Sequence, residues 1–195
     1  MASDFTKVLP LRYQSVSYET DVPEEVKQTF AEQIRNRNGM YIYGEAGVGK
    51  THLACALAKY LLESGIDVMF YNTGDFLEKL REEFQKTDEE EDYFFSLFRE
   101  TMDFKGVLVF DDIGAEKISD WARERIYLII NKKYEDMVPI IFTSNVDLEI
   151  ISARMGDRVA SRIKEMTKEV KQGGKDRRLN PGTNMNTLNG ENNKQ

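Results

Sequence analysis

The sequence contains one cysteine, Cys55, and one histidine, His52, among its 195 residues. A single cysteine excludes a disulfide within the chain and any metal site built from a cluster of cysteines. No apolar run is long enough to span a bilayer, and the first residues lack the apolar core of a signal peptide. We therefore expect a cytoplasmic protein without membrane contact, long enough to form one well-buried domain.

A glycine-rich stretch follows the apolar residues 40–43. Its spacing, Gly44-x-x-x-x-Gly49-Lys50-Thr51, fits a phosphate-binding loop. The glycines allow a tight turn whose N–H groups converge at the start of a helix, where the helix dipole favours an anion. Lys50 is expected to reach the β- and γ-phosphates of a nucleotide, and the Thr51 hydroxyl is expected to ligate Mg²⁺. A glycine-rich turn that binds nothing is the alternative.

The predicted nucleotide site comprises Gly44, Glu45, Ala46, Gly47, Val48, Gly49, Lys50, Thr51 and His52. His52 is interpreted as a helix-start residue near the nucleotide, with a catalytic histidine as the alternative. Cys55 lies among small apolar residues of the same helix, so we expect it to be packed in the core.

Short apolar strands alternate with amphipathic helices along the chain. Strands are expected within residues 40–43, 67–72, 106–114, 139–145 and 167–171. Helices are expected within residues 21–39, 50–64, 74–84, 87–100, 119–136 and 147–166, with Asp21 and Thr73 as N-caps and a break near Gly156. This alternation predicts an α/β fold with a parallel five-stranded sheet and helices on both faces. Residues 1–20 are interpreted as an irregular lead-in, and the asparagine-rich residues 179–195 as a disordered tail.

Polar residues follow two of the buried strands at the point where each strand ends. Asp111 and Asp112 come after an apolar strand, and Asn145 ends the next one. Ligands of parallel sheets bind beyond the carboxyl ends of the strands. We expect Asp111 to hold Mg²⁺ with Thr51, Asp112 to orient or deprotonate a water, and Asn145 to position that water. Ordinary polar turns after the two strands are the alternative.

The two signs of charge are separated along the chain. From Asp75 to Asp103 there are eleven acidic and four basic residues, a net charge of −7. From Arg154 to Arg178 there are nine basic and four acidic residues, a net charge of +5. The basic block can contact the phosphates of a nucleic acid or of a neighbouring subunit's nucleotide, and a plain solvated surface is the alternative.

The segments "YGEAGVGKTHLACALA", "VLVFDDIG", "IIFTSN" and "GDRVASRIKEM" resemble, in this order and spacing, the AAA+ ATPases of the DnaC/DnaI helicase-loader and IstB transposition-helper group. The resemblance extends from about Pro10 to Arg178. It implies a P-loop NTPase fold of the AAA+ type, with one ATPase domain over residues 21–178. It also implies ATP and Mg²⁺ as ligands.

The resemblance assigns roles to single residues. Gly44 to Thr51 match the Walker A motif, Asp111 and Asp112 match Walker B, and Asn145 matches the sensor-1 residue. Arg162 matches the arginine finger that acts on the nucleotide of a neighbouring subunit, with Arg158 on the same helix face as the fallback. Arg177 or Arg178 is a candidate sensor-2 arginine, and the choice between them stays open. The expected catalytic residues are therefore Lys50, Asp112, Asn145 and Arg162, and the expected metal ligands are Thr51 and Asp111.

We therefore expect an ATPase that hydrolyses ATP slowly, self-associates on ATP binding and acts in DNA replication by loading a replicative helicase. A transposition helper ATPase of the IstB type is the alternative within the group. A P-loop small-molecule kinase and a non-hydrolysing helicase-binding module are alternatives from other classes.

The chain departs from the family pattern in two ways. Helicase loaders carry a separate amino-terminal module, whereas fewer than about forty residues precede the first strand here, which suggests a truncated or minimal relative. Family members contact single-stranded DNA through basic residues of an insertion after the second strand, and the matching residues 75–103 are acidic. We therefore expect weak binding of single-stranded DNA.

Overall fold

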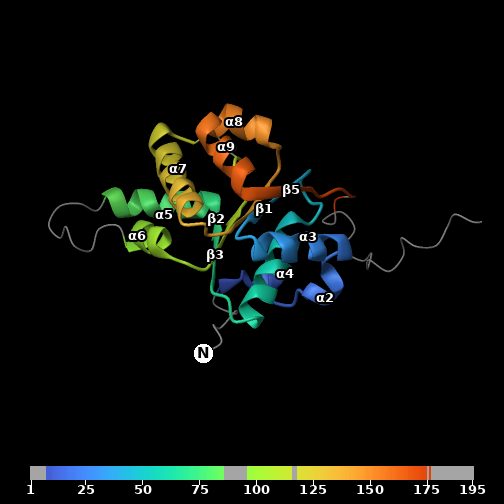
Figure 1. Cartoon of the computed structure of the whole chain (residues 1–195). Coiled ribbons are helices and arrows are strands. Elements are labelled where there is room, and N and C mark those ends of the chain that lie inside the picture. Colours follow the sequence, from blue (N-terminus) through green and yellow to red (C-terminus); the bar gives the residue numbers. More distant parts are fainter. Residues whose placement is uncertain (1–7, 86–95, 116–117, 175, 177–195) are drawn as a thin grey trace, which may run out of the picture.

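The computed structural model describes residues 8–85, 96–115, 118–174 and 176. Five parallel strands form one sheet in the order β2-β3-β4-β1-β5 (Figure 1). The strands are β1 (Gly39–Tyr43), β2 (Val68–Asn72), β3 (Val107–Asp111), β4 (Ile140–Ser144) and β5 (Thr167–Lys171). At least one helix connects each strand to the next in sequence, as parallel pairing requires. The predicted α/β class with a parallel five-stranded sheet is confirmed.

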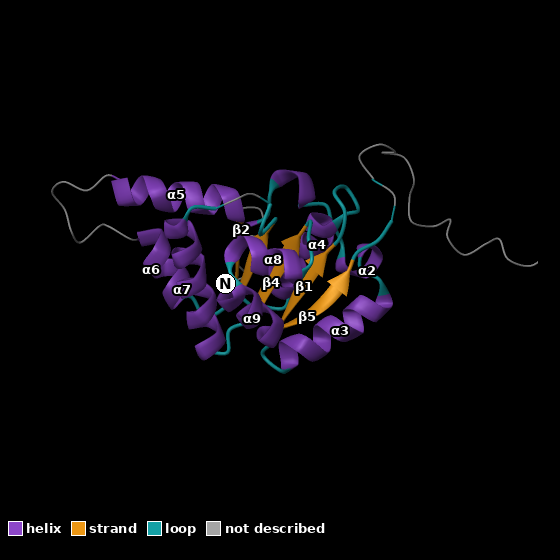
Figure 2. Cartoon of the chain, turned by 90° about the horizontal axis from the view of Figure 1, so that it is seen from above, coloured by secondary structure: helices purple, strands orange, loops and turns teal. Residues whose placement is uncertain are grey.

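Helices cover both faces of the sheet (Figure 2). The helical segments are η1 (Leu11–Tyr13), α2 (Tyr18–Asp21), α3 (Glu24–Arg35), α4 (Lys50–Glu63), α5 (Thr73–Gln85), α6 (Ser96–Asp103), α7 (Asp120–Glu135), α8 (Leu148–Met155) and α9 (Asp157–Met166). One core cluster packs α5, α7, α8 and α9 on one face, and the other packs α3 and α4 on the opposite face. Among the described residues, no helix combines the length and apolarity needed to cross a bilayer.

Strand β3 shows how burial on both faces shapes the sequence. Val107 and Val109 belong to the cluster beneath α3 and α4, whereas Leu108 and Phe110 belong to the cluster beneath α5 and α7. The sides alternate because successive side chains of a strand point to opposite faces of the sheet. A strand covered on both faces has to be apolar throughout, so its polar residues appear where it leaves the core, at Asp111.

The first described residues differ from the predicted irregular lead-in. They contain η1 and α2, and the side chains of Leu9 and Val16 are buried. Lys59 on α4 donates hydrogen bonds to the backbone carbonyls of Gln14 and Val16. Packing against α4 therefore orders a segment that has no helical periodicity of its own.

Both predicted helix caps are wrong. Asp21 is the last residue of α2, and the N-cap of α3 is Pro23. Thr73 donates its hydroxyl to the Asp111 carbonyl, whereas the Asn72 side chain accepts from two backbone N–H groups in the first turn of α5. The Thr73 hydroxyl thus makes a tertiary hydrogen bond instead of capping its helix, and Asp21 belongs to a helix that the local capping rules did not predict.

Three sequence predictions fall on residues outside the described ranges. The predicted helix over residues 87–100 is described only from Ser96, where α6 begins. The predicted tail, residues 179–195, is not among the described residues, and neither are Arg177 and Arg178.

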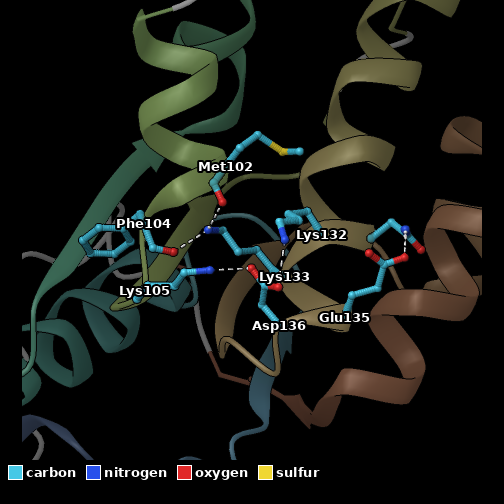
Figure 3. A network of polar contacts seen from close by, with 8 residues as sticks. Met102, Phe104, Lys105, Lys132, Lys133, Glu135 and Asp136 are labelled. Atoms are coloured by element: carbon cyan, nitrogen blue, oxygen red, sulfur yellow. Dashed lines mark hydrogen bonds and ion pairs between the residues drawn. The ribbon is translucent and has the colours of Figure 1, made fainter.

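A buried lysine connects α6 to α7. The Lys133 side chain is 0% exposed, and its Nζ donates hydrogen bonds to the carbonyls of Met102 and Phe104 at the end of α6 (Figure 3). Beside it, the Asp136 carboxylate forms ion pairs with Lys105 and Lys132. Burial lowers the pKa of Lys133 to about 8 from the ordinary value of 10.5.

Candidate functional site

The loop between β1 and α4 contains the predicted phosphate-binding residues. Gly47 and Gly49 have φ angles of +81° and +100°, in the left-handed region where a side chain would cost energy. Gly49 is the N-cap of α4, so the loop turns directly into a helix of 14 residues. The first N–H groups of a helix have no partner within it, and the helix dipole is positive there. The loop can therefore accept an anion.

Lys50 is the first residue of α4, and its side chain folds back over the loop. Its Nζ donates hydrogen bonds to the Gly44 carbonyl at 2.9 Å and to the Glu45 carbonyl at 2.7 Å. A third bond, of 2.6 Å, reaches Oδ1 of Asn145 at the end of β4. The side chain thus places a largely buried positive charge between the loop and the strand ends.

Thr51 and Asp111 meet at the centre of the site. The Thr51 hydroxyl donates to Asp111 Oδ1 at 2.9 Å, and the Thr143 hydroxyl donates to the same oxygen at 2.6 Å. Burial raises the pKa of Asp111, and the two hydroxyl donors partly offset this rise.

A hydroxyl beside a carboxylate fits a magnesium ion, which is commonly held by one or two protein oxygens together with substrate phosphates and water. No group of three or more histidine, cysteine, aspartate or glutamate side chains with metal-binding geometry occurs among the described residues. Thr51 and Asp111 are suited to a cation whose other ligands come from a nucleotide and water.

Asp112 takes an unusual backbone conformation directly after β3. Its φ is +60°, a left-handed value that costs energy for a residue other than glycine. Its backbone N–H donates to the Thr143 hydroxyl at 2.8 Å, and its Oδ1 accepts from Asn145 Nδ2 at 2.8 Å. Because Asn145 also accepts from Lys50, this amide bridges the loop lysine and the second acid. The strained turn therefore holds a carboxylate at a fixed place.

These residues surround a cavity of about 830 Å³. Of the predicted site, the residues that line it are Ala46, Gly47, Gly49, Lys50, Thr51, His52, Asp111, Asp112 and Asn145. Gly44, Glu45 and Val48 do not line it, and Val48 is buried in the core. The structure therefore brings together the three sets of strand-end residues that the sequence separates.

Sequence reasoning missed part of the cavity wall. Arg12 and Tyr13 contribute from the first described segment, and Asn72 contributes from the end of β2. Asn72 could have been found, because it ends a predicted strand as Asn145 does. Nothing local marks Arg12 or Tyr13, which reach the cavity only because the segment packs on α4. His52 turns toward this segment. Its Nε2 lies 3.3 Å from Oδ2 of Asp21, the last residue of α2, and its ring is edge-on to Tyr13.

The predicted arginine finger does not line the cavity. Arg162 is held by contacts within the chain: its Nε donates to Asn131 Oδ1 at 3.0 Å, and its guanidinium lies 4.2 Å from the centre of the Tyr134 ring. Its Nη1 is 3.4 Å from a carboxylate oxygen of Glu165. Arg158, one turn earlier on α9, is exposed. The two arginines that the sequence left as alternatives therefore differ: the Arg162 side chain is held by contacts within the chain, and the Arg158 side chain is exposed.

The chain matches the family described as "IstB-like ATP binding protein" over residues 12–180. It belongs to this family. The predicted resemblance to the DnaC/DnaI and IstB group is thereby confirmed.

This IstB-like protein is similar to curated relatives over part of their length. It is 32% identical over 108 residues to "Replicative helicase loader DnaI" of Bacillus subtilis (strain 168). The aligned part covers 55% of this chain and 33% of the relative. It is 24% identical over 136 residues to "Replicative helicase loader DnaC" of Escherichia coli (strain K12), which covers 69% of this chain and 54% of the relative. The chain thus spans between a third and about half the length of these relatives.

Solved structures share the fold of this IstB-like protein. "Crystal structure of the DnaC helicase loader" matches with a TM-score of 0.72 and 28% identity, covering 84% of this chain and 100% of that chain. "Replication initiator DnaA bound to AMPPCP and single-stranded DNA" matches with a TM-score of 0.70 and 22% identity, covering 86% of this chain and 51% of that chain. These likenesses confirm the P-loop fold of the AAA+ type.

Proposed function

We propose that this protein binds ATP with Mg²⁺ and hydrolyses it slowly, as a AAA+ switch in DNA replication. The observation that supports this most is the hydrogen-bonded group formed at the carboxyl ends of β3 and β4 by Lys50, Thr51, Asp111, Asp112, Thr143 and Asn145. In a member of an ATP-binding family, this group provides a cation, a pair of oxygens for a metal and a second acid.

Each part of the group has a role in the proposal. The N–H groups of the loop and the Lys50 ammonium bind the phosphates. Thr51 Oγ1 and Asp111 would hold Mg²⁺, which would supply positive charge at the phosphate oxygens. Asp112 accepts the proton of a water as the water oxygen bonds to the γ-phosphorus of ATP and the bond from that phosphorus to the ADP oxygen breaks. Asn145 orients this water while it holds the Asp112 carboxylate in place.

The proposal is tested by substituting Asp112→Asn. Asn keeps an acceptor oxygen for the Asn145 amide and spares Asp111, so ATP should still bind with nearly unchanged affinity. It cannot take a proton from water, so hydrolysis should fall at least about tenfold. Equilibrium nucleotide binding and steady-state phosphate release measure the two effects separately.

Asp67→Asn is the matched control, because Asp67 is exposed and lies before β2, at the other end of the sheet. It should change neither quantity. Lys50→Ala should abolish nucleotide affinity, since it removes the cation of the loop. Normal hydrolysis by Asp112→Asn would show that Asp112 is not the base. Failure of the unaltered protein to bind ATP would contradict the whole proposal.

The proposed partner is a replicative helicase, supported by the two relatives named as replicative helicase loaders. A transposition helper is the alternative, because the family is described as IstB-like. Co-sedimentation with a purified replicative helicase and, separately, with a transposase distinguishes the two. A kinase would transfer phosphate to a small acceptor, and a non-hydrolysing module would leave ATP intact after long incubation.

The proposal includes self-association on ATP binding and weak contact with single-stranded DNA. Among the described residues of the acidic stretch, α5 and α6 carry several carboxylates, and a phosphate backbone is repelled by such a surface. Cytoplasmic localisation remains a prediction of the sequence.

A further inference from the structure

The turn that carries Asp112 contains two left-handed backbone positions. Asp112 has a φ of +60°, and Gly114, two residues later, has a φ of +75°. A left-handed conformation costs energy at a residue other than glycine, so Asp112 keeps it only where the surrounding contacts enforce it. The contacts that hold residues 112–114 therefore decide where the second acid of the site lies.

Strand β4 holds the first half of this turn. The backbone N–H of Asp112 donates to the Thr143 hydroxyl, and the backbone N–H of Ile113 donates to the Thr143 carbonyl, both at 2.8 Å. The Ser144 hydroxyl donates to the Ile113 carbonyl at 2.7 Å. These bonds fix Asp112 and Ile113 against the end of the strand.

Helix α8 holds the second half of the turn. The Arg154 guanidinium donates from Nη1 to the Gly114 carbonyl. A Cβ placed on Gly114 would lie 2.3 Å from Cδ1 of Ile151, one turn earlier on α8, so the helix packs directly on the glycine backbone. Within the described part of the chain, the Gly114 carbonyl is the only hydrogen-bond or ion-pair partner of Arg154. The guanidinium is therefore committed to this turn.

We propose that Arg154 is a positioning residue for ATP hydrolysis, which holds the Gly114 carbonyl and so keeps the Asp112 carboxylate where it takes the proton of the water. Arg154 is not among the residues that line the cavity, so it acts through Asp112 and not on the nucleotide. Without its hydrogen bond, the turn relaxes and the carboxylate moves, whereas the phosphate-binding loop keeps its place. A displacement of about 1 Å at a reacting group costs up to about a hundredfold in rate. This inference rests on the proposed function, because it concerns the same acid.

The test compares Arg154→Met, which removes the donor and keeps a long side chain, with Arg154→Lys, which keeps a charged donor. Each variant is assayed well below its thermal midpoint, so that loss of folded protein does not enter kcat. The kcat should fall about tenfold in Arg154→Met and less in Arg154→Lys, with KM and the affinity for a non-hydrolysable ATP analogue unchanged. A lower thermal midpoint with an unchanged kcat would show a role in stability alone and would overturn the inference.

Two further comparisons show whether Arg154 acts through Asp112 of its own chain. In an Asp112→Asn background, Arg154→Met should cause no further loss of hydrolysis, because the group that it positions is already inactive. Mixing Arg154→Met with Lys50→Ala should restore no turnover, because the chain with the intact loop carries the displaced acid. A further loss in the double variant, or rescue on mixing, overturns the inference.

Arg35→Met is the matched control, because Arg35 is an exposed arginine in the last turn of α3, on the opposite face of the sheet. It should change neither kcat nor KM. An unchanged kcat in Arg154→Met, or an equal loss in Arg154→Lys, overturns the inference and leaves the proposed function standing if Asp112→Asn still loses hydrolysis. If the unaltered protein does not hydrolyse ATP, the proposed function itself fails, and this inference fails with it.

Discussion

The polar side chains at the strand ends hold one another in place at a cost to the folded state. Asp111 is 8% exposed, and its ionised form has lost most of its water. Two hydroxyl donors and the neighbouring Lys50 stabilise the charge, but burial dominates and raises the pKa of Asp111. Asp112 adds backbone strain at a φ of +60°. Such costs are expected where a site is arranged for a ligand that supplies the missing positive charge.

Asp111→Asn should therefore stabilise the protein in the absence of nucleotide. A group whose pKa is raised by folding contributes stability below its ordinary pKa, and that contribution is lost as the pH rises through the raised value. At neutral pH the ionised Asp111 is thus unfavourable, and the amide should gain on the order of 1 kcal/mol. Thermal unfolding should show a midpoint about 2–4 °C higher at neutral pH.

This advantage of Asp111→Asn should shrink as the pH is lowered toward the ordinary carboxyl range, where the unaltered residue becomes protonated. Asp67→Asn, which alters an exposed carboxylate, should change the midpoint at neither pH. A lower midpoint at neutral pH would mean that the hydrogen bonds to the carboxylate outweigh its desolvation.

Helices α6 and α7 are joined through the side chain of Lys133 (Figure 3). The last carbonyls of a helix have no partner within it, and here a buried ammonium satisfies carbonyls at the end of α6. The charged groups around this ammonium are Lys105, Lys132, Asp103 and Asp136. The pKa of Lys133 nevertheless falls to about 8, because burial outweighs the two carboxylates.

Replacing Lys133 by Met should remove a pH dependence of stability. A lysine whose pKa is depressed by folding binds its proton more weakly in the folded state, so stability rises with pH between about 8 and 10.5. The free energy of unfolding of the unaltered protein, minus that of Lys133→Met, should rise on the order of 3 kcal/mol across this range. Urea titrations at several pH values measure it.

Lys164→Met serves as the control for Lys133→Met, because Lys164 is an exposed lysine of α9. Its difference from the unaltered protein should stay flat over the same range. A flat difference for Lys133→Met as well would show that the buried ammonium keeps its proton as readily as an unfolded lysine does.

At the scale of the whole molecule, the two candidate finger arginines of α9 differ in the contacts that each would have to break to reach another subunit. Arg162 would have to leave Asn131, Tyr134 and Glu165 before it could reach another subunit's nucleotide. Arg158 is exposed and needs no such rearrangement. If the protein self-associates, Arg158 could therefore reach a neighbouring nucleotide at a lower free-energy cost than Arg162, because it has fewer contacts to break.

We expect Arg158→Ala to bind ATP normally, to lose hydrolysis and to keep the thermal midpoint of the lone subunit. Arg162→Ala should lower that midpoint by about 2–4 °C, because it removes a hydrogen bond and a cation–π contact. Mixing Arg158→Ala with Lys50→Ala should restore turnover, because a mixed interface pairs an intact loop with an intact arginine. If instead Arg162→Ala loses hydrolysis and regains it on mixing with Lys50→Ala, while Arg158→Ala does not, the arginine finger is Arg162 despite its contacts in this structure.

The sequence by itself determined the succession of strands and helices along the chain and the residues of the phosphate-binding loop. Both are local: strands buried on two faces have to be apolar, and the glycines and Lys50 have a fixed spacing. The same logic placed Asp111, Asp112 and Asn145 at the strand ends, since parallel strands end at one edge of the sheet.

Only the tertiary structure decided which side chains meet there. Lys50 and Asn145 are 95 residues apart in sequence, and their hydrogen bond depends on the register in which β1 and β4 pair. Tertiary contacts likewise turned Thr73 away from its helix, held Arg162 on α7 and placed Arg154 against the turn that follows β3. Local patterns carry no information on such contacts, because the partners become neighbours only when the sheet and its two helical layers are complete.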